Sequence, residues 1–389
     1  MHVGLNLIYL VPGETGGMEV VARELLPELL KAAPGVKFTA FINREAAAAG
    51  DGPWGEVLPA VTVPVNASSR AQWVLGDQVL LPPLARRHRI HLMHSLASIA
   101  PAWGPYRRVV TVHDIIYARF PETHAGLRDL GMRVLVPAAV RSAHRVIVDA
   151  HSTKHDLVHM LHAEERKIDV VPLGLGAPRR HQPAPEAQLR ERLQLGTRQV
   201  ILSLSAKRPH KNLSILIRAL GRIDPERRPL LVLPGYPTAH EDELRQLAAA
   251  QGLSDDVRFL HWISSEDLEG LWGLTRVFVF PSLYEGFGLP LLEAMDRSVP
   301  VAASNASSLP EVAGDAALLF DPHDLAQLAD AIERLLFDND LRQTLIARGA
   351  ERVKQFTWER TARGSLDSYA RALGLAGPPA SWGVTPAQP

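Results

Sequence analysis

The hydrophobic residues of the chain fall into short apolar runs that alternate with longer amphipathic segments. Residues 3–10 are an apolar run, and residues 18–32 (MEVVARELLPELLKA) then place their apolar side chains near helical spacing. The later runs of the first half end in small or polar residues: VKFTAFIN, IHLMHS, RRVVTVHD, HRVIVDA and IDVVPLG. Short strands buried on both faces, each followed by a helix, are typical of parallel sheets with right-handed crossovers.

This alternation stops at residues 176–188 (GAPRRHQPAPEAQ), which are rich in proline and arginine and predict a linker. It restarts with the runs QVILSLSA, RPLLVLPGY, VRFLHW, RVFVFPS, VPVAASN and AALLFDP, separated by helical segments. We therefore predict an α/β fold with two Rossmann-like, doubly wound parallel-sheet domains, residues 1–176 and 177–356, facing each other across a cleft. Residues 357–376 predict a helix that packs back on the first domain. The Pro/Gly-rich residues 377–389 predict a disordered tail.

Composition narrows the function classes. Lys+Arg and Asp+Glu are both 42, so the net charge is zero, which argues against a nucleic-acid partner held by bulk charge. The absence of cysteine excludes disulfides, thiol catalysis and thiolate metal sites. The first residues lack the basic region of a signal peptide, and no run reaches transmembrane length. We expect a cytoplasmic protein, and peripheral contact with the inner face of the membrane stays open.

Polar chemistry follows the run RVFVF, in residues 281–295 (PSLYEGFGLPLLEAM). Gly286 and Gly288 allow a ligand to approach the backbone closely, and proline at position 290 suits the first turn of a helix. Backbone amides at the start of that helix favour a phosphate or a sugar hydroxyl. Glu285 would lie in the loop and Glu293 one turn inside the helix. The alternative reading is a surface helix with two solvated acids.

A basic loop, SLSAKRPHKN, follows the run at 200–204. Lys207, Arg208 and Lys211 place three cations at a strand end that enters a helix, where a diphosphate could be neutralised. A solvated basic helix start is the alternative, although a cation there opposes the helix dipole.

In the first half, the glycine loop VPGETGGME lacks the spacing of a dinucleotide fingerprint. His113 and Asp114 end the strand RRVVTV. A lone histidine there is more often structural than functional, and Asp114 could orient His113 or cap a helix. The segment HDLVH (residues 155–159) resembles the zinc motif HExxH, but Asp reaches less far than Glu and no third acidic ligand is suitably spaced. We expect no metal site.

The stretch EGFGLPLLEAM resembles the Glu-x7-Glu signature of retaining glycosyltransferases of family 4, which have the GT-B architecture, and the resemblance extends along most of the chain. The resemblance implies that Glu285 holds the donor sugar, that Glu293 binds the ribose, and that His113 contacts the sugar. It also implies that Lys207 and Lys211 meet the donor diphosphate. The other donor-binding residues that it implies are Gly16, Gly17, Ser205 (where many members have Gly), Arg208, Gly286, Phe287, Gly288 and Leu289.

A family member of this kind would transfer a hexose from a nucleoside diphosphate sugar to a hydroxyl of an acceptor, with retention and without a metal or other cofactor. GDP-mannose is the favoured donor, and the acceptor would be a saccharide, a lipid-linked oligosaccharide or a small metabolite. His113, Lys211 and Glu285 would be the catalytic residues. A glycosyl phosphorylase, a nucleotide-sugar hydrolase or epimerase, and a non-catalytic nucleotide-sugar-binding protein are the alternatives.

Overall fold

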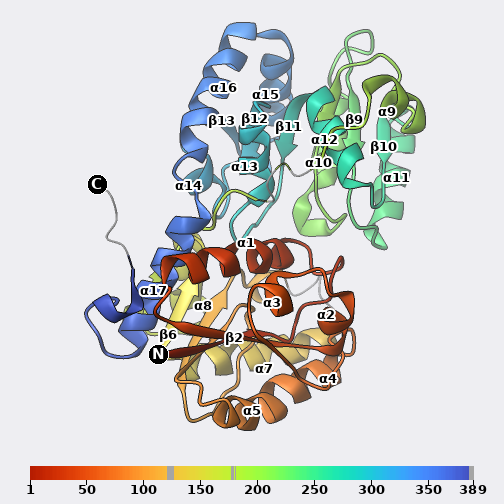
Figure 1. Cartoon of the computed structure of the whole chain (residues 1–389). Coiled ribbons are helices and arrows are strands. Elements are labelled where there is room, and N and C mark those ends of the chain that lie inside the picture. The colour runs from red at the N-terminus through yellow and green to blue at the C-terminus, as the bar shows by residue number, and fades with distance from the viewer. Residues whose placement is uncertain (121–126, 177–178, 180, 385–389) are drawn as a thin grey trace. The chain divides into compact units, whose positions relative to one another are not determined.

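A computed structural model of the chain describes residues 1–120, 127–176, 179 and 181–384. The chain divides into two compact units (Figure 1). Unit 1 consists of Met1–Gly176 and Phe356–Pro389, and unit 2 of Ala177–Gln355. Each unit contains one parallel sheet with helices on its faces, so the predicted α/β class with two parallel-sheet domains is confirmed.

The sheet of unit 1 has the strand order β3-β2-β1-β4-β5-β6-β7, and every pairing among these strands is parallel. This is the doubly wound order, which reverses between β1 and β4. The central strand β1 is buried at every position, as expected for a strand covered on both faces. The strands are β1 (His2–Leu7), β2 (Lys37–Ile42), β3 (Ala60–Thr62), β4 (Leu92–Ser95), β5 (Arg107–Val112), β6 (Arg145–Val148) and β7 (Ile168–Val170).

The helices of unit 1 cover both faces of this sheet. One of them changes its winding at Gly76–Leu80, where a π-helical turn (η1) lies between two α-helical segments. The helical segments are α1 (Gly17–Ala32), α2 (Arg44–Ala49), α3 (Pro53–Glu56), α4 (Arg70–Leu75), η1 (Gly76–Leu80), α5 (Leu81–Arg87), α6 (Ile116–Arg119), α7 (Leu127–Ser142), α8 (His151–Leu161), η3 (Glu165–Lys167), α17 (Trp358–Ala372) and η5 (Ala380–Trp382).

The last helix of the chain belongs to unit 1. The helix α17 begins at the N-cap residue Thr357, whose side chain accepts a hydrogen bond from the backbone of Arg360, and it packs against α1 and β6 (Figure 1). Its buried Tyr369 hydroxyl lies 2.7 Å from Nδ1 of His94 in β4, and Nε2 of His94 lies 2.8 Å from the Thr111 hydroxyl. This buried polar chain connects α17 to the middle of the sheet.

His94 makes the stability of unit 1 sensitive to acid. Burial, with a smaller effect of His113, lowers the pKa of His94 to about 3, whereas an unfolded chain has it near 6.5. The unfolded chain therefore binds a proton that the folded chain excludes, and the free energy of unfolding falls as the pH falls from about 6.5 toward 3. We expect this residue to contribute a slope of up to about 1.4 kcal/mol per pH unit.

Urea unfolding of the wild type and of His94→Gln between pH 7 and 5 measures this contribution. The variant should lose part of the acid sensitivity, while the exposed-site control His155→Gln keeps it. Equal slopes for the wild type and His94→Gln would contradict the assignment.

The segment after α17 differs from the predicted disordered tail. Residues Ala380–Trp382 form the short helix η5, and the Trp382 side chain is buried. The backbone N–H of Gly35 donates to the carbonyl of Trp382 at 3.0 Å. Proline and glycine removed any periodic signal here, but one tryptophan buries enough apolar surface to fix the segment. Residues 385–389 lie outside the described residues.

The sheet of unit 2 has the order β10-β9-β8-β11-β12-β13, again with parallel pairing throughout these strands. This is the same doubly wound order, which here reverses between β8 and β11. The strands are β8 (Val200–Leu202), β9 (Leu230–Leu233), β10 (Val257–Phe259), β11 (Thr275–Phe280), β12 (Val301–Ser304) and β13 (Ala317–Phe320).

The helices of unit 2 pack their apolar faces on this sheet. The helices α10 and α15, for example, bury Leu216, Leu220, Ile332 and Leu335 against it. The helical segments are α9 (Glu186–Arg192), η4 (Pro209–Lys211), α10 (Leu213–Leu220), α11 (His240–Ala250), α12 (Ser265–Leu274), α13 (Leu289–Asp296), α14 (Leu309–Ala313), α15 (Leu325–Phe337) and α16 (Asn339–Val353).

Candidate active site

The switch point of unit 2 collects the polar residues that the sequence singled out in its second half. Strands β8 and β11 are neighbours, and the strand order reverses between them. The basic loop follows β8, and the stretch at 281–288 follows β11. In doubly wound sheets, ligands bind outside the carboxyl ends of the strands at this point. The topology therefore brings both predicted loops to one ligand-binding edge.

Lys211 and Glu285 form an ion pair at this edge. The Nζ of Lys211 donates to Oε1 of Glu285 at 2.6 Å, and both side chains are largely buried. The same Nζ lies 5.8 Å from the centre of the Phe280 ring, which adds a cation–π contact. A carboxylate and an aromatic face thus hold this ammonium group in place in a poorly hydrated environment, where its interaction with an anionic ligand is strong.

Two serines fix the loop that carries Glu285. Ser307 and Glu285 exchange hydrogen bonds in both directions through the Ser307 hydroxyl. The Ser308 hydroxyl donates to the carbonyls of Glu285 and Phe287, at 3.0 and 2.8 Å. Sequence reasoning missed both serines as positioning residues. The adjacent hydroxyls in NASSLPEV were the available signal, but such a pair is also common in ordinary turns.

The helix α13 begins immediately after this loop. Gly288 has φ 111°, and a Cβ atom there would lie 2.8 Å from Cδ2 of Leu309, so glycine is required on both grounds. Pro290 lies in the first turn, and Phe287 is buried. The N–H of Leu291 already donates to the carbonyl of Gly288 at 3.0 Å. Leu289 is the first residue of the helix, so the positive end of its dipole is at the predicted ligand edge.

Lys207 has a different environment from Lys211. It is fully buried, and its Nζ donates to the carbonyls of Gly235 and Leu260, at 2.8 and 2.7 Å. Oε2 of Glu241 lies 3.5 Å away. Burial lowers the pKa of Lys207, and Glu241 opposes that effect. The ammonium group connects the loops after β9 and β10, whereas Lys211 lies beside Glu285. Diphosphate binding by Lys207 stays a prediction.

Three other predicted donor-binding residues of unit 2 lie on the same elements. Ser205 is partly buried, and among the described residues its hydroxyl has no hydrogen-bond partner. Arg208 is exposed at the start of η4. Glu293 is half-buried one turn inside α13, as expected from its position after Pro290. Their roles toward a donor stay predictions.

His113 is the first residue after β5 in unit 1. Its Nδ1 lies 2.7 Å from Oδ2 of Asp149, the first residue after β6. Its Nε2 lies 2.9 Å from the carbonyl oxygen of Leu96, the first residue after β4. Burial disfavours the imidazolium form, but the Asp149 carboxylate more than offsets this and the pKa of His113 rises to about 9. Sequence reasoning did not find Asp149, which lies 36 residues away.

Of the two roles that the sequence left open for Asp114, the contacts of its side chain support capping. Its Oδ1 accepts a hydrogen bond of 3.0 Å from the backbone N–H of Ile116, so it caps the turn that follows β5.

The glycine loop lies at the carboxyl end of β1. Gly16, with φ 63°, is the N-cap residue of α1, and Gly17 is the first residue of that helix. Contact of these glycines with a donor stays a prediction, as does the cleft between the two domains.

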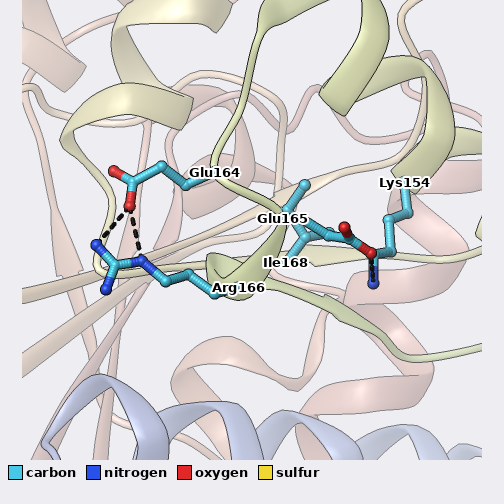
Figure 2. Close-up of a pocket in the computed structure, with 5 residues that line it drawn as sticks. All are labelled: Lys154, Glu164, Glu165, Arg166 and Ile168. Carbon is cyan, nitrogen blue, oxygen red and sulfur yellow. Dashed lines mark hydrogen bonds and ion pairs between the residues drawn. The ribbon is translucent and has the colours of Figure 1, made fainter.

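A surface depression in unit 1 is unrelated to these strand ends. It is lined by Lys154, Glu164, Glu165, Arg166 and Ile168, as Figure 2 shows. Arg166 pairs with Glu164 and Lys154 with Glu165. The depression adjoins the amino end of β7, and its charges neutralise one another. It is therefore a poor candidate for an anionic ligand.

The residues of the HDLVH motif lie close together through contacts with one another, and Nδ1 of His155 lies 3.7 Å from Oδ1 of Asp156. The rings of His155 and His159 stack with their centres 3.9 Å apart. Nδ1 of His159 also lies 2.8 Å from the backbone carbonyl oxygen of His155, one turn earlier in the same helix. Asp156 lies near Arg119. Within the described ranges, no group of three or more His, Asp or Glu side chains could hold a metal ion. Nor is any helix there long and apolar enough to span a bilayer.

Comparisons with known proteins agree along both halves of the chain. The family model Glycosyltransferase Family 4 matches residues 15–176, and the model Glycosyl transferases group 1 matches residues 186–352. The O-antigen chain mannosyltransferase B of Escherichia coli is 33% identical over 268 residues, covering 68% of this chain and 70% of that protein. A serotype-specific mannosyltransferase WbdA of Escherichia coli is 37% identical over 178 residues, covering 44% of this chain but only 22% of its own length.

A solved structure extends the likeness to three dimensions. HepE of Anabaena, in complex with UDP and glucose, has a TM-score of 0.72 at 20% identity, covering 96% of this chain and 99% of that one. Two doubly wound sheets and this likeness define a fold of the GT-B architecture. The chain belongs to glycosyltransferase family 4, also described as glycosyl transferases group 1, and it is a glycosyltransferase.

Proposed function

We propose that this glycosyltransferase moves a mannosyl group from GDP-mannose to a hydroxyl of a saccharide or glycolipid acceptor, with retention at the anomeric carbon. The observation that carries the proposal is the Lys211–Glu285 pair at the switch point of unit 2. The mannosyltransferase relative supports the choice of sugar. A cytoplasmic location, at the inner face of the membrane when the acceptor is lipid-linked, is part of the proposal.

The reaction breaks the bond between the anomeric carbon and the phosphate oxygen and forms a bond to the acceptor oxygen. The electron pair of the broken bond goes to the diphosphate, and stabilising that charge is the main catalytic task. Lys211 would leave Glu285 partly or wholly and bind the diphosphate, with the amino end of α13 as a second positive group. These groups would supply the positive charge without a metal ion.

Glu285 would then lie beside the donor sugar, where its carboxylate stabilises the oxocarbenium-like charge. The acceptor proton would pass to an oxygen of the leaving diphosphate on the same face, which gives retention without a covalent enzyme intermediate. Glu293 would accept hydrogen bonds from the ribose hydroxyls. His113 would contact the sugar from unit 1.

Donor choice can be tested by thermal shift with GDP, GDP-mannose, UDP, UDP-glucose and dTDP. A ligand at about 100 times its Kd stabilises the folded state by about 2.7 kcal/mol. We expect GDP and GDP-mannose to raise the Tm more than the other nucleotides do at equal concentration. An equal response to all bases, or a stronger response to UDP, the nucleotide bound by HepE, would overturn the proposed donor.

Product analysis tests the reaction itself. With GDP-mannose and an oligosaccharide acceptor, NMR should show a new α-linked mannose, and excess EDTA should leave the rate unchanged. An inverted product would contradict retention, and loss of activity in EDTA would contradict the metal-free mechanism. Sugar release into water, or a product that forms only with free phosphate, would identify a hydrolase or a phosphorylase instead.

A further inference from the structure

The His113–Asp149 pair occupies a special place in the sheet of unit 1. Strands β4, β5 and β6 are adjacent, and Leu96, His113 and Asp149 are the first residues beyond their carboxyl ends. His113, on the middle strand, lies 2.7 Å from Asp149 on one side and 2.9 Å from the Leu96 carbonyl on the other. Both ring nitrogens therefore face acceptors, and both can donate at once only when the imidazole carries two protons.

The burial of Asp149 also favours a doubly protonated His113. Its side chain is 2% exposed, and a carboxylate charge at such a site needs a compensating charge. Among the described residues, its second oxygen, Oδ1, has no hydrogen-bond partner. His113 is thus the group that balances the charge of Asp149.

The other titratable groups around His113 do not compete with this pairing. Asp114, next in the chain, accepts from the backbone of Ile116 and adds a smaller attraction for a positive ring. His94 on β4 is held between the Tyr369 and Thr111 hydroxyls, and burial keeps it neutral.

From this geometry we propose that Asp149 is a positioning residue for sugar transfer, which holds His113 as a fixed, doubly protonated imidazolium. The inference rests on the proposed function, in which His113 contacts the donor sugar. In this state His113 has no lone pair to accept a proton, so it cannot be the general base for the acceptor hydroxyl. It acts instead through its fixed orientation, because only the doubly protonated ring can donate to Asp149 and to the Leu96 carbonyl at the same time.

The first test follows the His113 ring by NMR of the full-length protein with labelled histidine, using the signal that disappears in His113→Gln. We expect this ring to stay protonated at pH 8 and to titrate near pH 9 in the wild type. In Asp149→Asn the midpoint should drop to about 6.5 or lower. A wild-type midpoint below 7 would overturn the proposal, even if the variant does not fold. This titration requires neither donor nor acceptor, so it is independent of the proposed function.

The second test is the pH profile of kcat/KM. With a pKa near 6.5, only about 3% of the rings are protonated at pH 8, so Asp149→Asn should lose at least about 30-fold between pH 5 and pH 8. The wild-type kcat/KM should change little between pH 5 and pH 8 through the titration of His113. The control Asp114→Asn should shift the alkaline limb much less than Asp149→Asn does, because Asp114 has the smaller effect on His113. A purely structural role would lower the activity of Asp149→Asn by the same factor at every pH, and that outcome would refute the proposal.

Discussion

Lys211→Met is expected to lower kcat/KM by about 100- to 1,000-fold, which corresponds to about 2.7–4 kcal/mol of lost transition-state stabilisation. The Lys211 ammonium is largely buried between Glu285 and the Phe280 ring, so its charge is poorly screened by water. Removing it takes away a group that would balance the growing charge of the diphosphate. The measurement is initial rates at saturating acceptor and varied donor.

Controls separate catalysis from folding in this experiment. Lys354→Met removes an exposed lysine that also pairs with a glutamate, and it should keep the wild-type rate. Glu285→Gln should lose a similar factor, and the double variant should be little worse than either single variant, because the two residues act as a unit. A Lys211→Met enzyme with wild-type turnover would exclude this lysine from the reaction.

Lys207→Met is expected to lower the free energy of unfolding of unit 2 by about 1–3 kcal/mol for each buried carbonyl that loses its donor, while Arg245 still pairs with Glu241 at 2.6 Å. The substitution leaves the carbonyls of Gly235 and Leu260 without their donor and weakens the charge balance of the buried Glu241. Thermal and urea unfolding with and without nucleotide measure the loss. The exposed control Lys354→Met should melt like the wild type.

A loss of donor affinity without a loss of stability in Lys207→Met would instead support the diphosphate-binding role that the sequence suggested for Lys207. If Lys207→Met melts normally and the KM for the donor rises instead, the buried ammonium would have to move onto the diphosphate when the donor binds. If stability falls and the donor KM of the folded fraction is unchanged, Lys207 connects two loops and does not bind the ligand.

The hydrophobic pattern predicted most strands of the two sheets, because the central strands are short and buried on each side. The runs at Val3–Leu10 and Arg276–Phe280, for example, correspond to β1 and β11 with small shifts of their ends. It missed β3 (Ala60–Thr62), an edge strand of three residues, two of which are exposed. It also missed the π-helical turn at Gly76–Leu80, since one extra residue in a turn hardly changes the helical spacing.

The sequence was sufficient to predict the motifs of the candidate site, but not which side chains contact one another there. The residues of the Glu-x7-Glu stretch are neighbours in sequence, so one pattern reveals them together. The partner of His113 lies on the next strand, and no local spacing signals it. Lys207 and Lys211 look equivalent in the sequence, yet one turn of 3-10 helix between them leaves only the second beside Glu285.

The discontinuous course of unit 1 affects how the chain folds during synthesis. Domains usually fold in the order in which the ribosome makes them. Here unit 2 is one continuous segment, whereas unit 1 needs Phe356–Pro389, including the Tyr369 hydroxyl that pairs with His94. Unit 2 can therefore finish first, and the apolar surface of α1, β5 and β6 that α17 covers stays exposed until Trp358–Ala372 has been made. A nascent chain stalled before residue 356 is the form of this protein that most needs a chaperone.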